Sequence, residues 1–198
     1  MNLLISKILG YQIRRKYIEE REKEIYEYAY MIFGEACINL LVAIMIGCFF
    51  GELKLVGCFL CSYIFLRRYS GGYHADKGYI CGIVSAVLII LLCVLYKMSI
   101  DIYIPRVGYF FLIIIQLSIC RLAPVDSKNK RLNESAKQKY RKIAIFFLVL
   151  QMAVIFLGIS LKIRYMYWGI SYSHVVLCFM MFIGTLKNYI GGISNHGE

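Results

Sequence analysis

The sequence predicts an all-α integral membrane protein, a helical bundle of about six spans with an amphipathic interfacial helix at its N-terminus. Of its 198 residues, 60% are hydrophobic, whereas soluble domains contain about 45–50%. Long apolar runs recur along the chain, and most of the charged residues lie between them. A soluble fold of this length would have to hide too much apolar surface. The length suggests one domain, since a domain usually has about 150 residues.

Residues 1–30 are expected to form the amphipathic helix. Ten charged residues fall between Arg14 and Glu27, while Tyr11, Ile18 and Ile25 recur every seven residues. An apolar stripe beside a strongly charged face is typical of a helix that lies on a bilayer. A solvated helix that packs on its own protein fits the same pattern equally well.

Residues 31–186 are expected to form the transmembrane bundle, and residues 187–198 a cytoplasmic tail. The bilayer core requires about 20 helical residues. Four apolar runs meet this length and two are shorter, and we expect all six to span the membrane. The long runs are 31–50, 79–96, 143–161 and 166–186, and the short runs are 55–66 and 107–120.

The distribution of Lys and Arg predicts the orientation of the spans. With six spans and both termini in the cytoplasm, 18 of the 23 basic residues fall on the cytoplasmic side and 5 on the other. The positive-inside rule requires this asymmetry. The loop that joins the second and third spans is then cytoplasmic as well.

The net charge of +11 follows from this topology, because basic cytoplasmic loops contact anionic lipids. No motif supports nucleic-acid binding. Eight basic residues lie between Arg121 and Lys142, against Asp126 and Glu134. They serve either topology and lipid binding or the attraction of an acidic peptide substrate, and the sequence favours neither.

The loop between the second and third spans has the composition of a reactive site. Gly71 and Gly72 allow a tight turn or a close backbone approach. His74 follows, and Cys81 lies in the first turn of the span that begins near Gly78. The positive end of the helix dipole favours the thiolate there. An imidazole can take the thiol proton and later protonate a leaving amine.

The spacing sets a geometric requirement on this pair. Seven residues of continuous helix would separate His74 from Cys81 by about 10 Å, so the helix has to begin after His74. Asp76 either caps that helix, which we favour, or orients the imidazole. By spacing alone, an interfacial histidine and one more buried cysteine are the commoner explanation. One His, one Cys and one Asp do not supply a metal site, and no cofactor is expected.

Two blocks of the sequence resemble a known family. The run RRYSGGYHA, residues 67–75, followed by Cys81, is similar to the signature of the accessory gene regulator protein B (AgrB) family. The run LAPVDSKNK, residues 122–130, resembles a second block of that family. Length, charge distribution and the order of apolar segments agree, so the resemblance spans most of the chain.

The resemblance implies a membrane cysteine endopeptidase in which Cys81 is the nucleophile and His74 the histidine. Supporting roles fall on Arg67 or Arg68 and on Gly72, beside the turn at Gly71. Such a protein would cut the C-terminal tail from an AgrD-type quorum-sensing propeptide. An acyl-enzyme thioester on Cys81 would then be attacked by a Cys or Ser side chain of the peptide, which closes a thiolactone or lactone ring.

Three polar residues inside apolar runs are expected to have structural roles. His174, Gln116 and Gln151 are interpreted as hydrogen-bonding groups within the bundle. The rivals to an enzyme are a membrane transporter or peptide exporter, and a scaffold subunit. A transporter would more often show internal repeats or broken spans, which this sequence lacks. A homodimer would suit so small a bundle.

Overall fold

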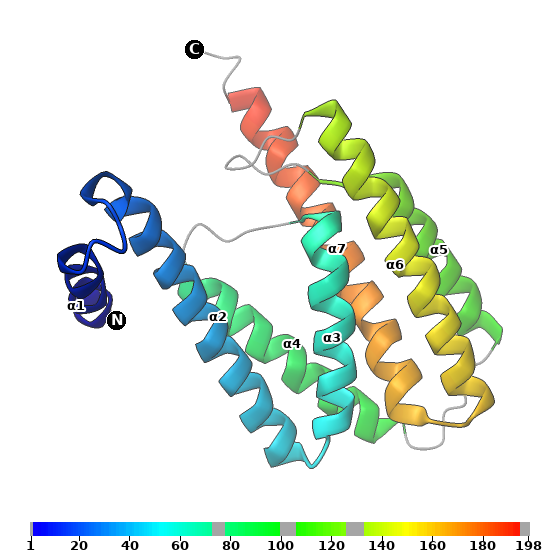
Figure 1. Ribbon diagram of the computed structural model, residues 1–198. Helices are drawn as coiled ribbons and strands as arrows, with labels where there is room; N and C mark the ends of the chain where they lie inside the picture. The colour runs from blue at the N-terminus through cyan, green and yellow to red at the C-terminus, as the bar shows by residue number, and fades with distance from the viewer. Residues whose placement is uncertain (1, 73–77, 100–105, 126–132, 195–198) are drawn as a thin grey trace.

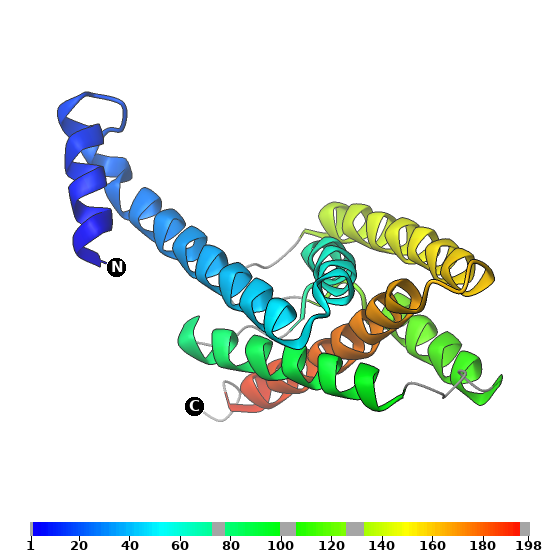
Figure 2. The ribbon, with the colours of Figure 1, turned by 90° about the horizontal axis from the view of Figure 1, so that it is seen from below.

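The computed structural model describes residues 2–72, 78–99, 106–125 and 133–194. These ranges contain seven α-helices and no strand, which confirms the all-α prediction. The helices are α1 (Asn2–Arg14), α2 (Lys23–Phe50), α3 (Leu53–Ser70), α4 (Gly78–Met98), α5 (Arg106–Leu122), α6 (Glu134–Ser160) and α7 (Arg164–Ser194), with a short 3-10 helix, Glu20–Glu22, before α2. Figures 1 and 2 show α3 and α7 inside the bundle and α1 away from it, at the end of α2.

Within the described residues, four helices are long and apolar enough to cross a bilayer, namely α2, α4, α6 and α7. They contain the four long apolar runs of the sequence, so that part of the prediction is confirmed. Helices α3 and α5 have 18 and 17 residues. The protein is therefore a membrane protein with four clear spans, and the count of six stays a prediction.

Helix α3 is less apolar than the other spans because it lies at the centre of the bundle. Its buried residues follow one stripe at helical spacing, and the helix packs against α2, α4, α6 and α7. The approach of α7 is closest at Gly169, where an added Cβ would lie 2.9 Å from the Leu55 carbonyl oxygen. Only glycine allows the two backbones to come this near.

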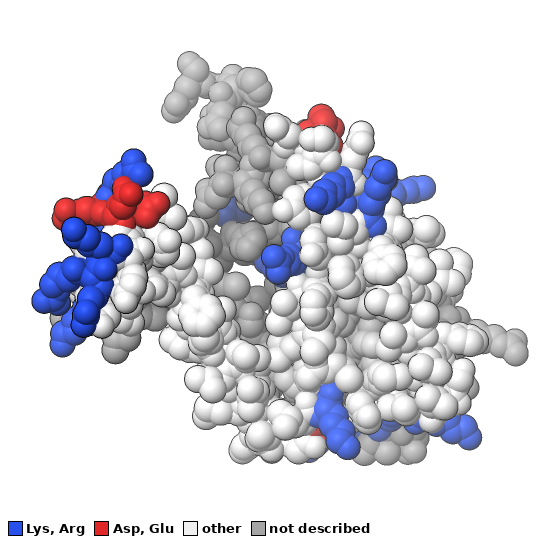
Figure 3. Space-filling view, in the orientation of Figure 1, with Lys and Arg blue, Asp and Glu red and all other residues white. Residues whose placement is uncertain are grey.

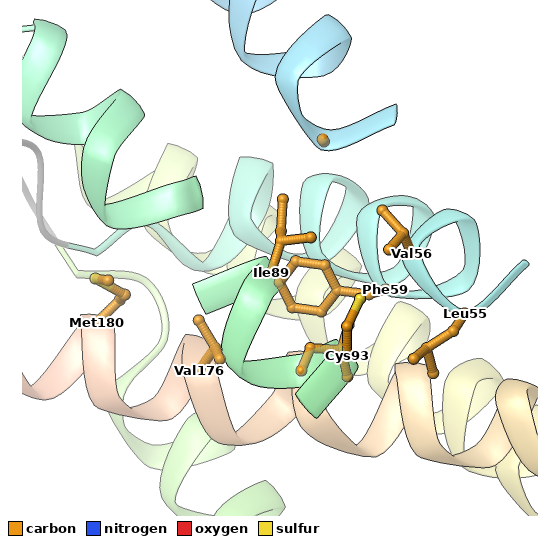
Figure 4. Packing of buried hydrophobic residues seen from close by; sticks show 9 residues of the cluster. Leu55, Val56, Phe59, Ile89, Cys93, Val176 and Met180 are labelled. Carbon is orange, nitrogen blue, oxygen red and sulfur yellow. The ribbon is translucent and has the colours of Figure 1, made fainter. Parts of the chain in front are cut away.

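An apolar cluster joins α3, α4 and α7. Figure 4 shows Phe59 of α3 beside Ile89 and Cys93 of α4, with Val176 of α7 below them. All four of these residues are at most 4% exposed. The cluster holds the body of α4 against α3 and α7, while the first turn of α4 lies beside α2 (Figures 1 and 2).

A buried polar network involves Ser62, on the same buried stripe of α3 as Phe59. The Ser62 hydroxyl lies 2.9 Å from the Gln151 Oε1 and 2.5 Å from the Ser173 hydroxyl, and Gln151 Nε2 donates to the Ser62 carbonyl oxygen at 3.1 Å. His174, which is fully buried, bonds Gln151 Oε1 through Nε2 at 2.7 Å and Gln116 Nε2 through Nδ1 at 3.3 Å. The network therefore connects α3, α5, α6 and α7.

These contacts assign one tautomer to His174. Nε2 faces an amide oxygen and so carries the proton, while Nδ1 faces an amide nitrogen and accepts. A neutral imidazole satisfies both neighbours without placing a charge in the bundle. The prediction that His174, Gln116 and Gln151 hydrogen-bond between helices is confirmed.

The N-terminal segment is divided where one amphipathic helix was expected. Helix α1 ends at Arg14, Lys16 has a positive φ of 57°, and α2 starts at Lys23. Because the chain turns back, Ile5 and Leu9 of α1 pack on Ile18, whereas the other two residues of the seven-residue repeat, Tyr11 and Ile25, are exposed. The repeat therefore does not form one stripe.

Cations and aromatic rings pair at the end of the bundle where α2, α4 and α6 finish. Arg164 of α7 donates to the Tyr96 carbonyl oxygen at 2.6 Å and to the Ser99 hydroxyl at 3.0 Å. Lys54 and Lys97 lie over the rings of Tyr165 and Phe50.

On the face shown in Figure 3, Lys and Arg gather on the α1 segment and at both ends of the bundle, with an uncharged band between. This pattern suits helices that cross a bilayer.

The polar network predicts the effect of replacing His174. Changing His174→Phe keeps a ring but removes the hydrogen bonds that the imidazole makes with the amide groups of Gln116 and Gln151. The free energy of unfolding should fall by about 1–3 kcal/mol, the cost of unsatisfied buried polar groups, as measured by thermal or SDS unfolding in micelles. Ser118→Ala, at a half-buried position whose hydroxyl bonds its own helix, should change little. Equal stability of His174→Phe and the wild type would contradict the prediction.

Candidate active site

The site begins where α3 ends, because the chain there turns on a glycine. Gly71 caps the helix with φ 72° and ψ −150°, and its N–H donates to the Arg67 carbonyl oxygen at 3.0 Å. Side chains with a Cβ rarely adopt this positive φ. The predicted tight turn is therefore present at Gly71.

The turn is paired with the segment that follows α5. The Val125 N–H donates to the Ser70 carbonyl oxygen at 2.9 Å, and Gly71 and Val125 form a parallel bridge. A Cβ on Gly71 would overlap the Val125 carbonyl oxygen, so glycine is required twice, by backbone angle and by space. This pairing places the described parts of the two blocks of sequence, residues 67–72 and 122–125, side by side.

The structure distinguishes the two neighbouring arginines. The Nη1 of Arg67 donates to the Tyr63 hydroxyl at 2.9 Å, and its guanidinium carbon lies 5.5 Å from the centre of the Tyr63 ring. A Cβ added to Gly72 would lie 3.5 Å from Arg67 Nη1 and 3.6 Å from the Met180 backbone of α7. Arg68 is exposed. Arg67 thus lies within the candidate site, between α3 and the Gly72 backbone.

Cys81 lies in the first turn of α4, as the sequence predicted, because α4 begins at Gly78. Its thiol is free and exposed, in contrast to Cys93 further along the same helix, which is buried. The first turn of α4 lies beside α2 and apart from the end of α3 (Figures 1 and 2). Arg67 and Tyr63 thus form a pair on α3, while Cys81 belongs to the side of α4 that faces α2.

Helix α2 packs against α4 next to Cys81. A Cβ on Gly82 would lie 2.8 Å from the Oδ1 of Asn39, a half-buried residue of α2. The Asn39 amide therefore lies against the backbone of the residue that follows the thiol. Its polar side chain is thus next to Cys81 along α4, and Glu35 lies one turn before it on α2.

Two of the residues predicted from sequence cannot be placed beside these. His74 and Asp76 lie outside the described residues, as does most of the second block, 126–132. Of the predicted site, the structure places Arg67, Gly71 and Gly72 together at the end of α3, and Cys81 on another helix, α4. The proximity of His74 to Cys81 stays a prediction.

Tyr63 and Asn39 were not predicted as part of the site. Tyr63 precedes Arg67 by four residues, a spacing that brings side chains together on a helix, so the sequence did contain a signal for that pair. Asn39 could be found only from the crossing of α2 and α4, since nothing in its local sequence relates it to Cys81.

The chain is similar in sequence to known proteins of one family. The family model described as Accessory gene regulator B matches residues 5–183. An AgrB-like protein of Clostridium perfringens (strain SM101, type A) is 27% identical over 185 residues, which cover 86% of this chain and 81% of that protein. AgrB-like protein 2 of Clostridium perfringens (strain 13, type A) is 28% identical over 152 residues, which cover 70% and 67%. No solved structure matches.

The family match includes both sequence blocks and every helix of the bundle, since it extends from α1 into α7. It also accounts for the four apolar spans as those of a membrane protein. The chain belongs to the accessory gene regulator B family, whose members take part in accessory gene regulator processing together with an AgrD-type partner.

Proposed function

We propose that this protein is a membrane-embedded cysteine endopeptidase that removes the C-terminal tail of an AgrD-type propeptide. The observation that carries the proposal is the position of Cys81, a free and exposed thiol in the first turn of α4. The turn after α3, with Arg67, Gly71 and Gly72, is the other part of the proposed site, and its pairing with Val125 holds it in place. The helix dipole at this position stabilises negative charge on sulfur.

In the proposed reaction, His74 takes the proton of the Cys81 thiol. The sulfur attacks the carbonyl carbon of the scissile peptide bond and forms a tetrahedral intermediate with a negative oxygen. As the C–N bond breaks, the imidazolium of His74 protonates the leaving amine. The peptide stays attached to Cys81 as a thioester.

The second half of the reaction regenerates the enzyme. A Cys or Ser side chain of the peptide attacks the thioester carbonyl, the C–S bond breaks, and Cys81 recovers its proton. The product is a thiolactone or lactone ring. The thioester conserves the energy of the cut bond, so ring closure competes with hydrolysis where water is excluded.

Both termini and the loop between α3 and α4 are proposed to face the cytoplasm. The end of α3, the start of α6 and the end of α7 lie toward the same end of the bundle (Figure 1). With the orientation expected from the basic residues, a propeptide made in the cytoplasm reaches the site directly.

The first test is cleavage of a co-expressed AgrD-type propeptide. Cys81→Ser and His74→Ala should leave the propeptide full-length, a loss of at least about a thousandfold in rate, as expected when a nucleophile or its base is removed. The peptide is followed by mass spectrometry, and insertion of each variant is checked in membranes. Cys61→Ser, which removes another exposed thiol, should cleave normally. Normal cleavage by Cys81→Ser or His74→Ala would refute the proposal and favour a transporter or scaffold.

The reactivity of Cys81 supplies a second test. In proteoliposomes, a water-soluble alkylating reagent should label Cys81 at least ten times faster than Cys37 and Cys48, which are exposed on the apolar helix α2, and His74→Ala should slow that labelling. Peptide mapping after short reaction times measures the rates. Uniform slow labelling of all eight cysteines would show that no activated thiol exists.

The turn at Gly71 predicts the effect of an added methyl group. Gly71→Ala should separate Val125 from the end of α3 and reduce propeptide cleavage at least tenfold, because its Cβ has no space and its φ is unfavourable. Gly57→Ala is the matched control, since nothing lies within 4 Å of an added Cβ there. Cleavage at the wild-type rate by Gly71→Ala would contradict the role of this turn.

A further inference from the structure

A groove between α2 and α3 opens to the outer surface of the bundle. The two helices diverge from the short connection that joins them (Figure 1), and the groove has a volume of about 320 Å³. This volume is at the lower end of the range of small-molecule sites, about 300–1,000 Å³. Its lining is apolar and includes Leu40 and Ile44 of α2 and Gly57, Cys61, Ile64 and Phe65 of α3.

The part of the chain that the structure describes leaves this groove open. A Cβ added to Gly57 would have nothing within 4 Å, and Ile64 and Phe65 are each 55% exposed. Because α2 is one of the four clear spans, the groove lies at the depth of the lipid hydrocarbon. An acyl chain is the occupant that suits such a lining, since it has no polar group that would lose its partners there.

The face of α3 that lines the groove ends in a cation. Gly57, Cys61, Ile64 and Arg68 follow one another at intervals of three and four residues, so the helix places them on one face. Arg68 lies in the last turn of α3 and is exposed. Among the residues that the structure describes, it has no ion-pair partner. A positive charge therefore lies at one end of the apolar groove.

Helix α6 adds a second cation at the same level. The ring centres of Tyr69 and Tyr140 are 5.8 Å apart, so the last turn of α3 is beside the first turns of α6. Arg68 and Lys139 each directly precede one of these tyrosines, and both are exposed. Lys139 shares its face of α6 with Phe146, seven residues later and 64% exposed. Both cations therefore belong to the outer surface.

No free carboxylate compensates this charge within α3 or α6, both of which are described completely. Their one acidic residue is Glu134, whose carboxylate lies 3.3 Å from the ammonium of Lys137. Figure 3 shows Lys and Arg side chains around the start of α6, at the end of the bundle where α3 finishes. The surface at this end of the groove is therefore positive.

We propose that this surface binds one anionic phospholipid, with an acyl chain in the groove and the phosphate on Arg68 and Lys139. A guanidinium pairs well with phosphate oxygens, and an ammonium adds a second positive charge. A zwitterionic lipid has the same chains, but its own cation weakens the attraction. The rings of Tyr69 and Tyr140 suit the boundary between headgroups and hydrocarbon. The inference is independent of the proposed endopeptidase function.

Native mass spectrometry of the full chain in detergent tests the charge requirement. Phosphatidylglycerol is compared with phosphatidylcholine that carries the same acyl chains. Arg68→Gln removes the cation at the groove. Arg141→Gln is the matched control, because it removes one exposed charge from the same part of α6. Arg141 continues the stripe of Ala144 and Leu148, which packs into the bundle and not toward the groove.

The wild type should bind phosphatidylglycerol at least about tenfold more tightly than phosphatidylcholine, since two cations contribute. Arg68→Gln should lower the affinity for phosphatidylglycerol about fivefold, the effect of one cation at an anionic lipid surface. The double variant Arg68→Gln/Lys139→Gln should lower it more than about tenfold. Arg141→Gln should stay within about twofold of the wild type.

Two further measurements test the acyl chain. Gly57→Phe keeps every charge but fills the groove, and should lower the affinity for phosphatidylglycerol at least about fivefold because apolar contact is lost. The unmodified chain offers a second measurement, in vesicles of phosphatidylcholine with and without phosphatidylglycerol. Phosphatidylglycerol should slow alkylation of Cys61 by a membrane-soluble maleimide about threefold. Cys48, exposed on α2 outside the groove, should react at the same rate in both.

Equal affinities for the two lipids, or unchanged binding by Arg68→Gln, would overturn the inference. An equal loss in Arg141→Gln would also overturn it, because the attraction would then be diffuse. Wild-type binding by Gly57→Phe, or an unprotected Cys61, would show that a phosphate group alone is held. A Cys61–Cys61 disulfide between two copies, formed under mild oxidation in place of protection by lipid, would make the groove an interface between copies and exclude the lipid site.

Discussion

The packing of α3 against α7 is the contact on which the other features of this protein depend. Gly169 brings the two backbones together, and Ser62 hydrogen-bonds Ser173 across the same interface. Helix α3 carries Tyr63 and Arg67, and α7 supports Gly72 through the backbone of Met180. Arg67 and the contact between Gly72 and Met180 both depend on this interface. A shift between α3 and α7 would therefore change the turn after α3 as well as the core. Hydrogen bonds through Gln151 and His174 oppose such a shift.

The polar residues inside this membrane protein divide into two groups with different consequences. The network around His174 is enclosed and satisfied, and it stabilises the bundle without carrying charge. Tyr63 and Arg67 form a pair on α3, where the Tyr63 ring and hydroxyl face the guanidinium, a charge that would be costly alone in an apolar interior. Cys81, in the first turn of α4, is exposed.

For the candidate site, the sequence was informative wherever a residue acts through its local geometry. Gly71 was predicted as a turn, and the end of α3 requires one with a positive φ. Cys81 was predicted in the first turn of a helix, and α4 begins three residues before it. The choice between Arg67 and Arg68 was open in the sequence, because both follow the same apolar run. It depends on which of them the helix directs toward Tyr63 and Gly72.

The sequence by itself determined the all-α membrane architecture and the four long spans, because a run of apolar residues of bilayer length has few other stable states. It also determined the interhelical roles of Gln116, Gln151 and His174, since polar groups in apolar runs must find partners. Only the tertiary structure decided which helices meet. The break after Arg14, the pairing of Val125 with the end of α3 and the place of Asn39 against Gly82 all depend on contacts between residues far apart in the chain. Such contacts depend on packing, not on local pattern.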